Sequence, residues 1–127
     1  MNLNQITIPS HDVARAVVFY TKLGLRLIVD SSPRYVRLEC PSGDSTFSIH
    51  HVEHPIPPDG VVIYFECENI DDKVSKLIRK GIQFDCDPMD QQWGWREAHL
   101  RDLDGNRLIL FHAGENRKYP PWRVVDK

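Results

Sequence analysis

Hydrophobic and polar positions along this chain of 127 residues follow two periods, and the same order of periods occurs twice. Residues 3–9 alternate as a β-strand does, and residues 13–23 carry apolar side chains at the i, i+3, i+4 spacing of a helix that lies on a sheet. Residues 61–67 and 70–80 repeat this pair of patterns. The repeat has a constant offset, since Asp12 and Asn69 are 57 positions apart, and so are Gly24 and Gly81. A fixed internal period predicts two similar modules.

Capping residues and turns place the boundaries of these elements. Asp12 is a favourable N-cap for the first helix, and Gly24 supplies a left-handed residue at its end. Alternation predicts three further strands in each half: residues 25–29, 35–40 and 46–51 in the first, and residues 82–86, 95–100 and 107–112 in the second. Residues 87–92 read as a proline-containing loop, and 102–106 (DLDGN) as a hairpin turn.

These elements predict an α+β protein with four parts. Residues 1–53 form a first βαβββ module, 54–60 (HPIPPDG) a linker, 61–113 a second βαβββ module and 114–127 a polar, proline-bearing tail. We expect the tail to wrap the surface or a partner subunit without regular structure. One face of each sheet should lie on its helix, and the other face carries an unusual number of polar side chains, which predicts a cavity for a ligand.

Composition narrows the classes of protein. Hydrophobic residues make up 41% and charged residues 27%, with a net charge of −2, which is typical of a soluble globular protein and gives no basic footprint for nucleic acid or membrane. The sequence shows no membrane span and no signal peptide, so a cytoplasmic protein is expected. Three cysteines, an odd number without a CxxC motif, argue against a disulfide framework or zinc knuckle. The cysteines are interpreted as small buried residues; the alternative is that one of them is a reactive thiol.

Three segments carry a resemblance to a known family. They are ITIPSHDVARAVVFYTKLGL (residues 6–25), YFECENIDDKVSKLIRKGI (64–82) and WGWREAHLRDLDGNRLILFH (93–112). The chain resembles the vicinal oxygen chelate superfamily over residues 3–113. That superfamily includes glyoxalase I, extradiol dioxygenases, fosfomycin-resistance enzymes and bleomycin-resistance proteins. The resemblance implies the glyoxalase/bleomycin-resistance fold, in which paired βαβββ modules form an open half-barrel cleft, and it implies a homodimer. It says less about activity, because this fold hosts many chemistries.

Metal-dependent relatives hold a divalent ion with side chains on the first and last strands of each module. The resemblance maps those positions onto Gln5, Val62 and Ile109, and onto Ser48, or His50 if the register shifts. Val62 and Ile109 have no donor atom, and Gln5 offers one neutral oxygen, whereas hard divalent ions need several oxygen or imidazole ligands. We therefore expect neither a metal site of the family type nor any other cofactor. No catalytic residue is predicted.

Polar and aromatic residues on the expected polar faces are the candidates for ligand binding. Three residue types have a second interpretation: packing in a core or dimer interface for the tryptophans, a hydrogen-bonded or exposed position for the histidines, and a solvated rim for the glutamates. Parity along the strand predicts that His99 shares a face with Trp95 and Glu97, whereas Arg96 points away and pairs with an acidic residue. The predicted ligand-binding residues are Glu39, His50, Tyr64, Glu66, Trp93, Trp95, Glu97 and His99.

These features predict a metal-free protein of the bleomycin-resistance type. It would bind a flat or cationic, antibiotic-like compound between aromatic and acidic groups, and so contribute to antibiotic resistance by sequestration. An alternative is a metal-dependent lyase, isomerase or dioxygenase with a rearranged site that uses His50, His99 or His112. A third interpretation is a regulatory or assembly module with a partner protein and no tight small ligand.

Overall fold

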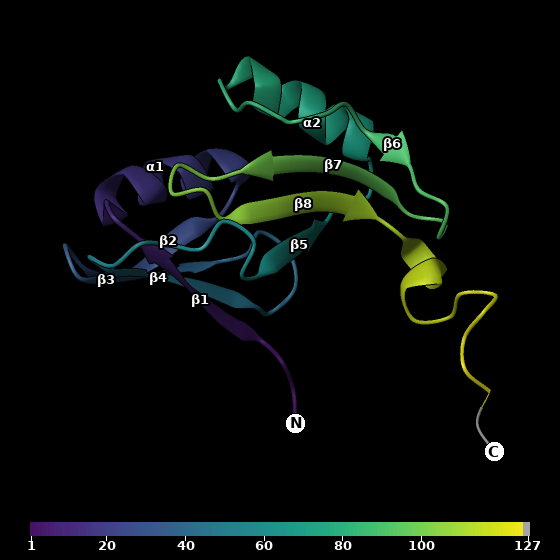
Figure 1. Cartoon of the computed structure of the whole chain (residues 1–127), viewed down its shortest axis with the longest axis horizontal. Coiled ribbons are helices and arrows are strands. Elements are labelled where there is room, and N and C mark those ends of the chain that lie inside the picture. Colours follow the sequence, from purple (N-terminus) through teal and green to yellow (C-terminus); the bar gives the residue numbers. More distant parts are fainter. Residues whose placement is uncertain (126–127) are drawn as a thin grey trace. The chain divides into compact units, whose positions relative to one another are not determined.

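A computed structural model describes residues 1–125 of the chain, and Figure 1 labels its elements. The last two residues of the predicted tail, 126–127, lie outside the described residues. In chain order, the elements are β1 (Gln5–Ser10), α1 (Val13–Leu23), β2 (Arg26–Ser31), β3 (Tyr35–Glu39), β4 (Thr46–His51), β5 (Val62–Glu66), α2 (Ile70–Arg79), β6 (Met89–Asp90), β7 (Arg96–Arg101), β8 (Arg107–His112) and the 3-10 helix η1 (Gly114–Arg117).

The chain divides into two compact units, each with one α-helix and one four-stranded mixed sheet. The first unit comprises Met1–Val61 together with Arg101–Asn106, and the second comprises Val62–Leu100 and the chain from Arg107 onward. The strand orders, β1-β4-β3-β2 and β5-β8-β7-β6, correspond to one another. In both units the first strand runs parallel to the last. The predicted α+β class with two βαβββ modules is confirmed.

Helix α1 has the predicted caps. The Asp12 side chain accepts a hydrogen bond from the backbone N–H of Arg15, and Gly24 follows the helix at φ 112°. Helix α2 begins in the same way, because Asn69 accepts a hydrogen bond from the N–H of Asp72. Gly81, at φ 93°, lies at the position that corresponds to Gly24. The internal repeat in the sequence is therefore also a repeat of local backbone geometry.

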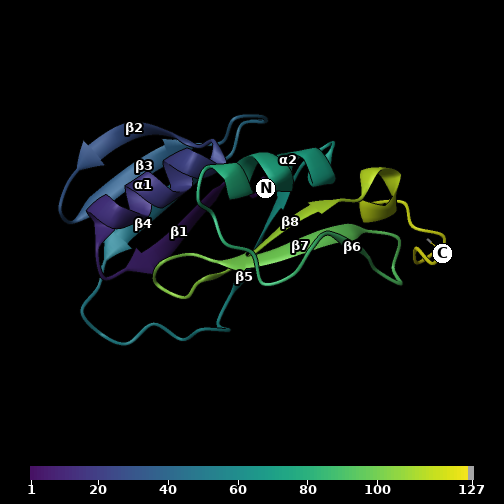
Figure 2. The same ribbon diagram turned by 90° about the horizontal axis from the view of Figure 1, so that it is seen from above.

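The core of the first unit lies between α1 and one face of its sheet. Figure 2 shows α1 lying along the sheet, with β2, β3, β4 and β1 side by side beneath it. Apolar side chains at i, i+3 and i+4 of α1 pack on alternate residues of the strands. The fully buried members are Tyr20, Val36, Leu38 and Ile49. The same alternation leaves the other face of the sheet to polar side chains.

A turn from the second repeat completes this core. Asp102, which is 7% exposed, accepts a hydrogen bond of 2.6 Å from the hydroxyl of Tyr20. It also accepts hydrogen bonds from the backbone N–H groups of Asp104 and Asn106. Burial, together with the charge of Asp102, raises the pKa of Tyr20 well above its usual range. The predicted DLDGN hairpin turn is thus also a packing element of the first unit.

Two expectations for the second half were wrong. Residues 82–86 form no strand; the short strand is Met89–Asp90, inside the segment predicted to be a loop. Residue 85 donates one backbone hydrogen bond to the carbonyl of His99, but this bond is out of register with the pairing of Met89 and Asp90 to β7, so no continuous ladder forms. The tail was expected to lack regular structure, yet Gly114–Arg117 forms a 3-10 helix.

Neither α1 nor α2, nor any other helix within residues 1–125, is long and apolar enough to span a bilayer. Cys40, Cys67 and Cys86 are free thiols, each partly buried. Burial raises the pKa of the Cys40 and Cys67 thiols, which lowers the share of reactive thiolate at neutral pH. This favours the structural interpretation of those two cysteines.

Candidate functional site

The polar face of the first sheet carries a hydrogen-bonded network. The side-chain amide of Gln5 donates to the hydroxyl of Ser48 at 2.6 Å, and the hydroxyls of Tyr35 and Ser48 are also 2.6 Å apart. Arg37 donates to the Tyr35 oxygen at 3.0 Å, while Thr46 donates to the Gln5 oxygen. The hydrogen bond with Ser48 lowers the pKa of the Tyr35 phenol. The polar groups on this face therefore satisfy one another.

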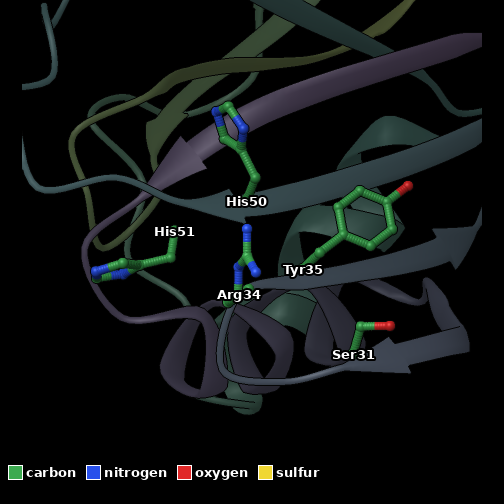
Figure 3. Close-up of a pocket in the computed structure, with 5 residues that line it drawn as sticks. All are labelled: Ser31, Arg34, Tyr35, His50 and His51. Atoms are coloured by element: carbon green, nitrogen blue, oxygen red, sulfur yellow. The ribbon is translucent and has the colours of Figure 1, made fainter.

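An open pocket of about 480 Å³ lies at one end of the same sheet. Figure 3 shows that its side chains come from β2, β3, β4 and the β2–β3 turn, and that the adjacent His50 and His51 point in different directions. His51 makes a contact of 3.3 Å with the Glu53 carboxylate. His50, one of the predicted ligand-binding residues, lines this pocket. The lining residues are Ser31, Arg34, Tyr35, His50 and His51.

Aromatic side chains dominate the corresponding face of the second sheet. Trp95 and Phe111 stack with their ring centroids 4.7 Å apart, and Tyr64 meets both rings edge-on, at 5.9 and 5.5 Å. Val62 and Ile109 pack in the same apolar cluster. Tyr64 remains 47% exposed, so the cluster presents one aromatic ring to its surroundings. We call these five residues the aromatic cluster.

A buried carboxylate lies next to this cluster. Glu97 is 2% exposed and accepts a hydrogen bond of 3.0 Å from the Nε1–H of Trp93. Its other oxygen is 2.8 Å from Nε2 of His99, whose Nδ1 is 3.4 Å from a guanidinium nitrogen of Arg107. The contact between Glu97 and His99 confirms that they share a face. Both oxygens of this buried carboxylate are thus engaged by protein groups.

Glu66 fastens the start of the tail to this sheet. One of its oxygens accepts hydrogen bonds from the backbone N–H groups of Ala113 and Gly114, at 3.0 and 3.2 Å. Its other oxygen is 3.8 Å from Arg117. Nε1 of Trp95 donates to the backbone oxygen of Asn116 at 3.2 Å. The 3-10 helix η1 is therefore held against the edge of the aromatic cluster by its own backbone.

The structure brings six of the eight predicted ligand-binding residues into the second unit. Glu39 and His50 lie in the first unit, and Glu39 pairs there with Arg26. Their binding role stays a prediction. Sequence reasoning missed Arg107 and Phe111. Strand alternation could have indicated them, because they lie on the same face of β8 as Ile109. The six residues in the second unit are Tyr64, Glu66, Trp93, Trp95, Glu97 and His99.

Arg96 points to the opposite face, as its parity predicts. It donates to Asp71 on α2 and to Asp90 on β6, each at 2.9 Å. These hydrogen bonds lower the pKa of the Asp71 carboxyl and raise that of the guanidinium. The expected pairing of Arg96 with acidic residues is confirmed. Arg96 ties the helix and the short strand to β7 and takes no part in the polar face.

The residues at the positions of a family-type metal site do not fit a divalent ion. Both ends of the Gln5 amide are committed to hydrogen bonds with its neighbours. Val62 and Ile109 lie in the aromatic cluster and bring no donor atom. Residues 1–125 contain no group of three or more His, Cys, Asp or Glu side chains that could hold a metal ion. The chemistry of these positions favours apolar contact over ligation.

Comparison with known proteins gives one family. The sequence profile of the Glyoxalase/Bleomycin resistance protein/Dioxygenase superfamily matches residues 2–110. No curated protein sequence matches the chain significantly.

Solved structures share the fold at low sequence identity. A glyoxalase/bleomycin resistance protein/dioxygenase from Nocardioides superposes with a TM-score of 0.79 at 20% identity, covering 98% of this chain and 90% of that one. A superfamily member from Sphaerobacter thermophilus gives a TM-score of 0.71 at 23% identity, covering 88% and 97%. A bleomycin-binding protein complexed with bleomycin gives 0.69 at 22% identity, covering 88% and 98%.

Proposed function

This chain belongs to the glyoxalase/bleomycin resistance protein/dioxygenase superfamily, and from that membership and the geometry of its second unit we propose that it binds a flat small molecule without a metal ion. A single observation carries the proposal. Val62 and Ile109, which stand where metal-dependent relatives have ligands, contribute to an apolar cluster with Trp95 and Phe111. The positions that bind a metal ion in those relatives would therefore make apolar contacts with a ligand in this protein.

An exposed aromatic ring next to a fixed aromatic stack suits a flat compound. Tyr64 is half exposed and is held edge-on by Trp95 and Phe111, so its ring loses little freedom when a ligand stacks on it. The antibiotic-binding relative supports small-molecule binding as a use of this fold. We propose Tyr64, Trp95 and His99 as ligand-contacting residues.

The three predicted ligand-binding glutamates bear on whether the ligand is selected by positive charge. Glu66 and Glu97 are occupied by protein N–H groups, and Glu39 by Arg26. A ligand cation would therefore compete with protein donors at each carboxylate. This favours a flat ligand over one selected by its positive charge.

The proposal extends to a homodimer, as the resemblance implies, and to a location in the cytoplasm. Leu27 and Ile28 are exposed on the edge strand β2, and Trp122 is 59% exposed in the tail, so apolar surface is available for a second subunit. Three free thiols are compatible with a reducing compartment.

A binding experiment on matched variants tests the proposal. We expect naphthalene-2-carboxamide, a neutral flat probe, to bind the wild-type protein in calorimetric titration with 1:1 stoichiometry per chain. Tyr64→Ala should weaken this binding by about 1–3 kcal/mol, the scale of one aromatic stacking contact. Tyr119→Ala removes a similarly exposed tyrosine from the tail and should leave the affinity unchanged. Equal affinities of Tyr64→Ala and the wild type would refute the assignment of this face.

A further inference from the structure

Arg107, at the start of β8, is the feature of the second unit that the proposed function leaves unused. We propose that Arg107 selects the ligand by its charge, and that the ligand is a flat compound carrying a carboxylate. This inference rests on the proposed function, because it concerns the same face of the same sheet.

Strand parity puts Arg107 on the face that carries the aromatic cluster. Arg107, Ile109 and Phe111 alternate along β8, so their side chains leave the sheet on one side. The parallel register pairs Val62 with Arg107 and Tyr64 with Ile109. The guanidinium therefore lies on the row of residues next to that of the exposed Tyr64 ring. A flat ligand on that ring can place an acidic substituent at Arg107.

Hydrogen bonding from behind positions the guanidinium. Arginine has no acceptor, so the contact of 3.4 Å between Arg107 and His99 requires Nδ1 of His99 to accept. The proton of the neutral imidazole then sits on Nε2, which donates to Glu97 at 2.8 Å. Glu97 is itself held by Trp93 and is 2% exposed. This chain of contacts runs from a buried anion to a half-buried cation, and His99 acts in it as a positioning residue.

Most of the donors of Arg107 remain available. A guanidinium has five N–H donors, and the contact with His99 uses one. Two other arginines of the second unit have carboxylate partners: Arg96 pairs with Asp71 and Asp90, and Arg117 approaches Glu66. Within residues 1–125, no carboxylate forms an ion pair with Arg107. A half-buried guanidinium of this kind gains most from a planar carboxylate, which it can bind with two parallel hydrogen bonds.

Charge selectivity for flat probes tests the inference on the unmodified protein. The probes are naphthalene-2-carboxylate, naphthalene-2-carboxamide and 2-naphthylmethylammonium, which share the ring system and differ in charge. By calorimetric titration of the wild type, we expect the carboxylate to bind at least about tenfold more tightly than the amide, and the ammonium least tightly.

Two arginine variants locate the selectivity. Arg107→Gln should abolish the preference, so that the carboxylate binds no more tightly than the amide. Arg96→Gln is the matched control, since Arg96 lies on the same sheet but on the helix-facing side with its own ion pairs, and it should keep the preference. Circular dichroism of each variant checks its folding, and the comparison of probes on the wild type needs no variant.

The possible failures are distinguishable. If the amide binds and depends on Tyr64, but the carboxylate has no advantage, the charge inference is overturned and the proposed function stands. The same holds if Arg107→Gln keeps the preference. If none of the three probes binds, both the proposed function and the inference are overturned.

Discussion

Replacing Glu97 by glutamine tests how the site is held together. The carboxylate accepts hydrogen bonds from Trp93 and His99 at 3.0 and 2.8 Å in a place where its side chain is 3% exposed. A glutamine has one acceptor oxygen and an NH₂ group that only donates, so it can satisfy one of these donors but not both. A change of His99 tautomer would restore the second hydrogen bond, but would then point Nδ1–H at Arg107.

The magnitude follows from two opposing effects. Loss of one charge-assisted hydrogen bond costs about 1.5–3 kcal/mol. Relief from burying a charge offsets part of that loss. We therefore expect Glu97→Gln to lower the free energy of unfolding by about 1–2 kcal/mol. With a urea slope of about 1.5 kcal/mol/M, the unfolding midpoint falls by about 1 M.

The assay is urea unfolding at pH 7 followed by circular dichroism, with Glu39→Gln as the matched control. Glu39→Gln is the same substitution at an exposed ion pair with Arg26, and it should lower the free energy of unfolding by less than about 0.5 kcal/mol. A Glu97→Gln protein as stable as the wild type would show that the buried carboxylate makes no net contribution, and the positioning of His99 and Arg107 would lose its basis.

Two further predictions concern the first unit and the metal question. Tyr20→Phe should destabilise the protein by about 1–2 kcal/mol in urea unfolding at pH 7, because Asp102 loses a buried donor. The pKa of Tyr20 is raised in the folded state, so the contribution of its hydroxyl to the free energy of unfolding is complete below the unfolded pKa of about 10 and is lost as pH rises through the folded pKa. The difference in stability between the wild type and Tyr20→Phe should therefore shrink above about pH 10. A constant difference would count against the buried hydrogen bond. Chelator-stripped protein should show no thermal stabilisation with Zn²⁺, Ni²⁺, Mn²⁺ or Fe²⁺; a shift near 2.7 kcal/mol at a hundredfold excess over Kd would mean that residues other than Val62 and Ile109 bind metal.

The sequence predicts those parts of the fold that depend on local chemistry. Asp12 and Asn69 cap the helices because their short side chains reach backbone N–H groups three residues ahead, which needs no tertiary information. The position of the short strand depends on tertiary contact. Residues 82–86 alternate as a strand does, but strand pairing with β7 is made by Met89 and Asp90 instead.

The same distinction holds for the site. Parity along β7 correctly separated His99 and Glu97 from Arg96, since it depends only on the period of a strand. The occupation of Glu66 by backbone N–H groups could not be read from the sequence, because its partners at Ala113 and Gly114 lie 47 and 48 positions away. Arg107 was missed because a single arginine at the start of a strand forms no motif.

The turn at Arg101–Asn106 limits how far the two halves can be treated as separate building blocks. It is encoded in the second repeat, but its Asp102 closes over Tyr20, its Asp104 accepts from the N–H of His11, and its Asn106 donates to the carbonyl of Pro9. A gene fragment ending in the linker would encode a first half without these contacts and with a tyrosine hydroxyl left in its core. Recombination that exchanges one repeat between relatives must therefore also preserve this turn, because the first unit includes it.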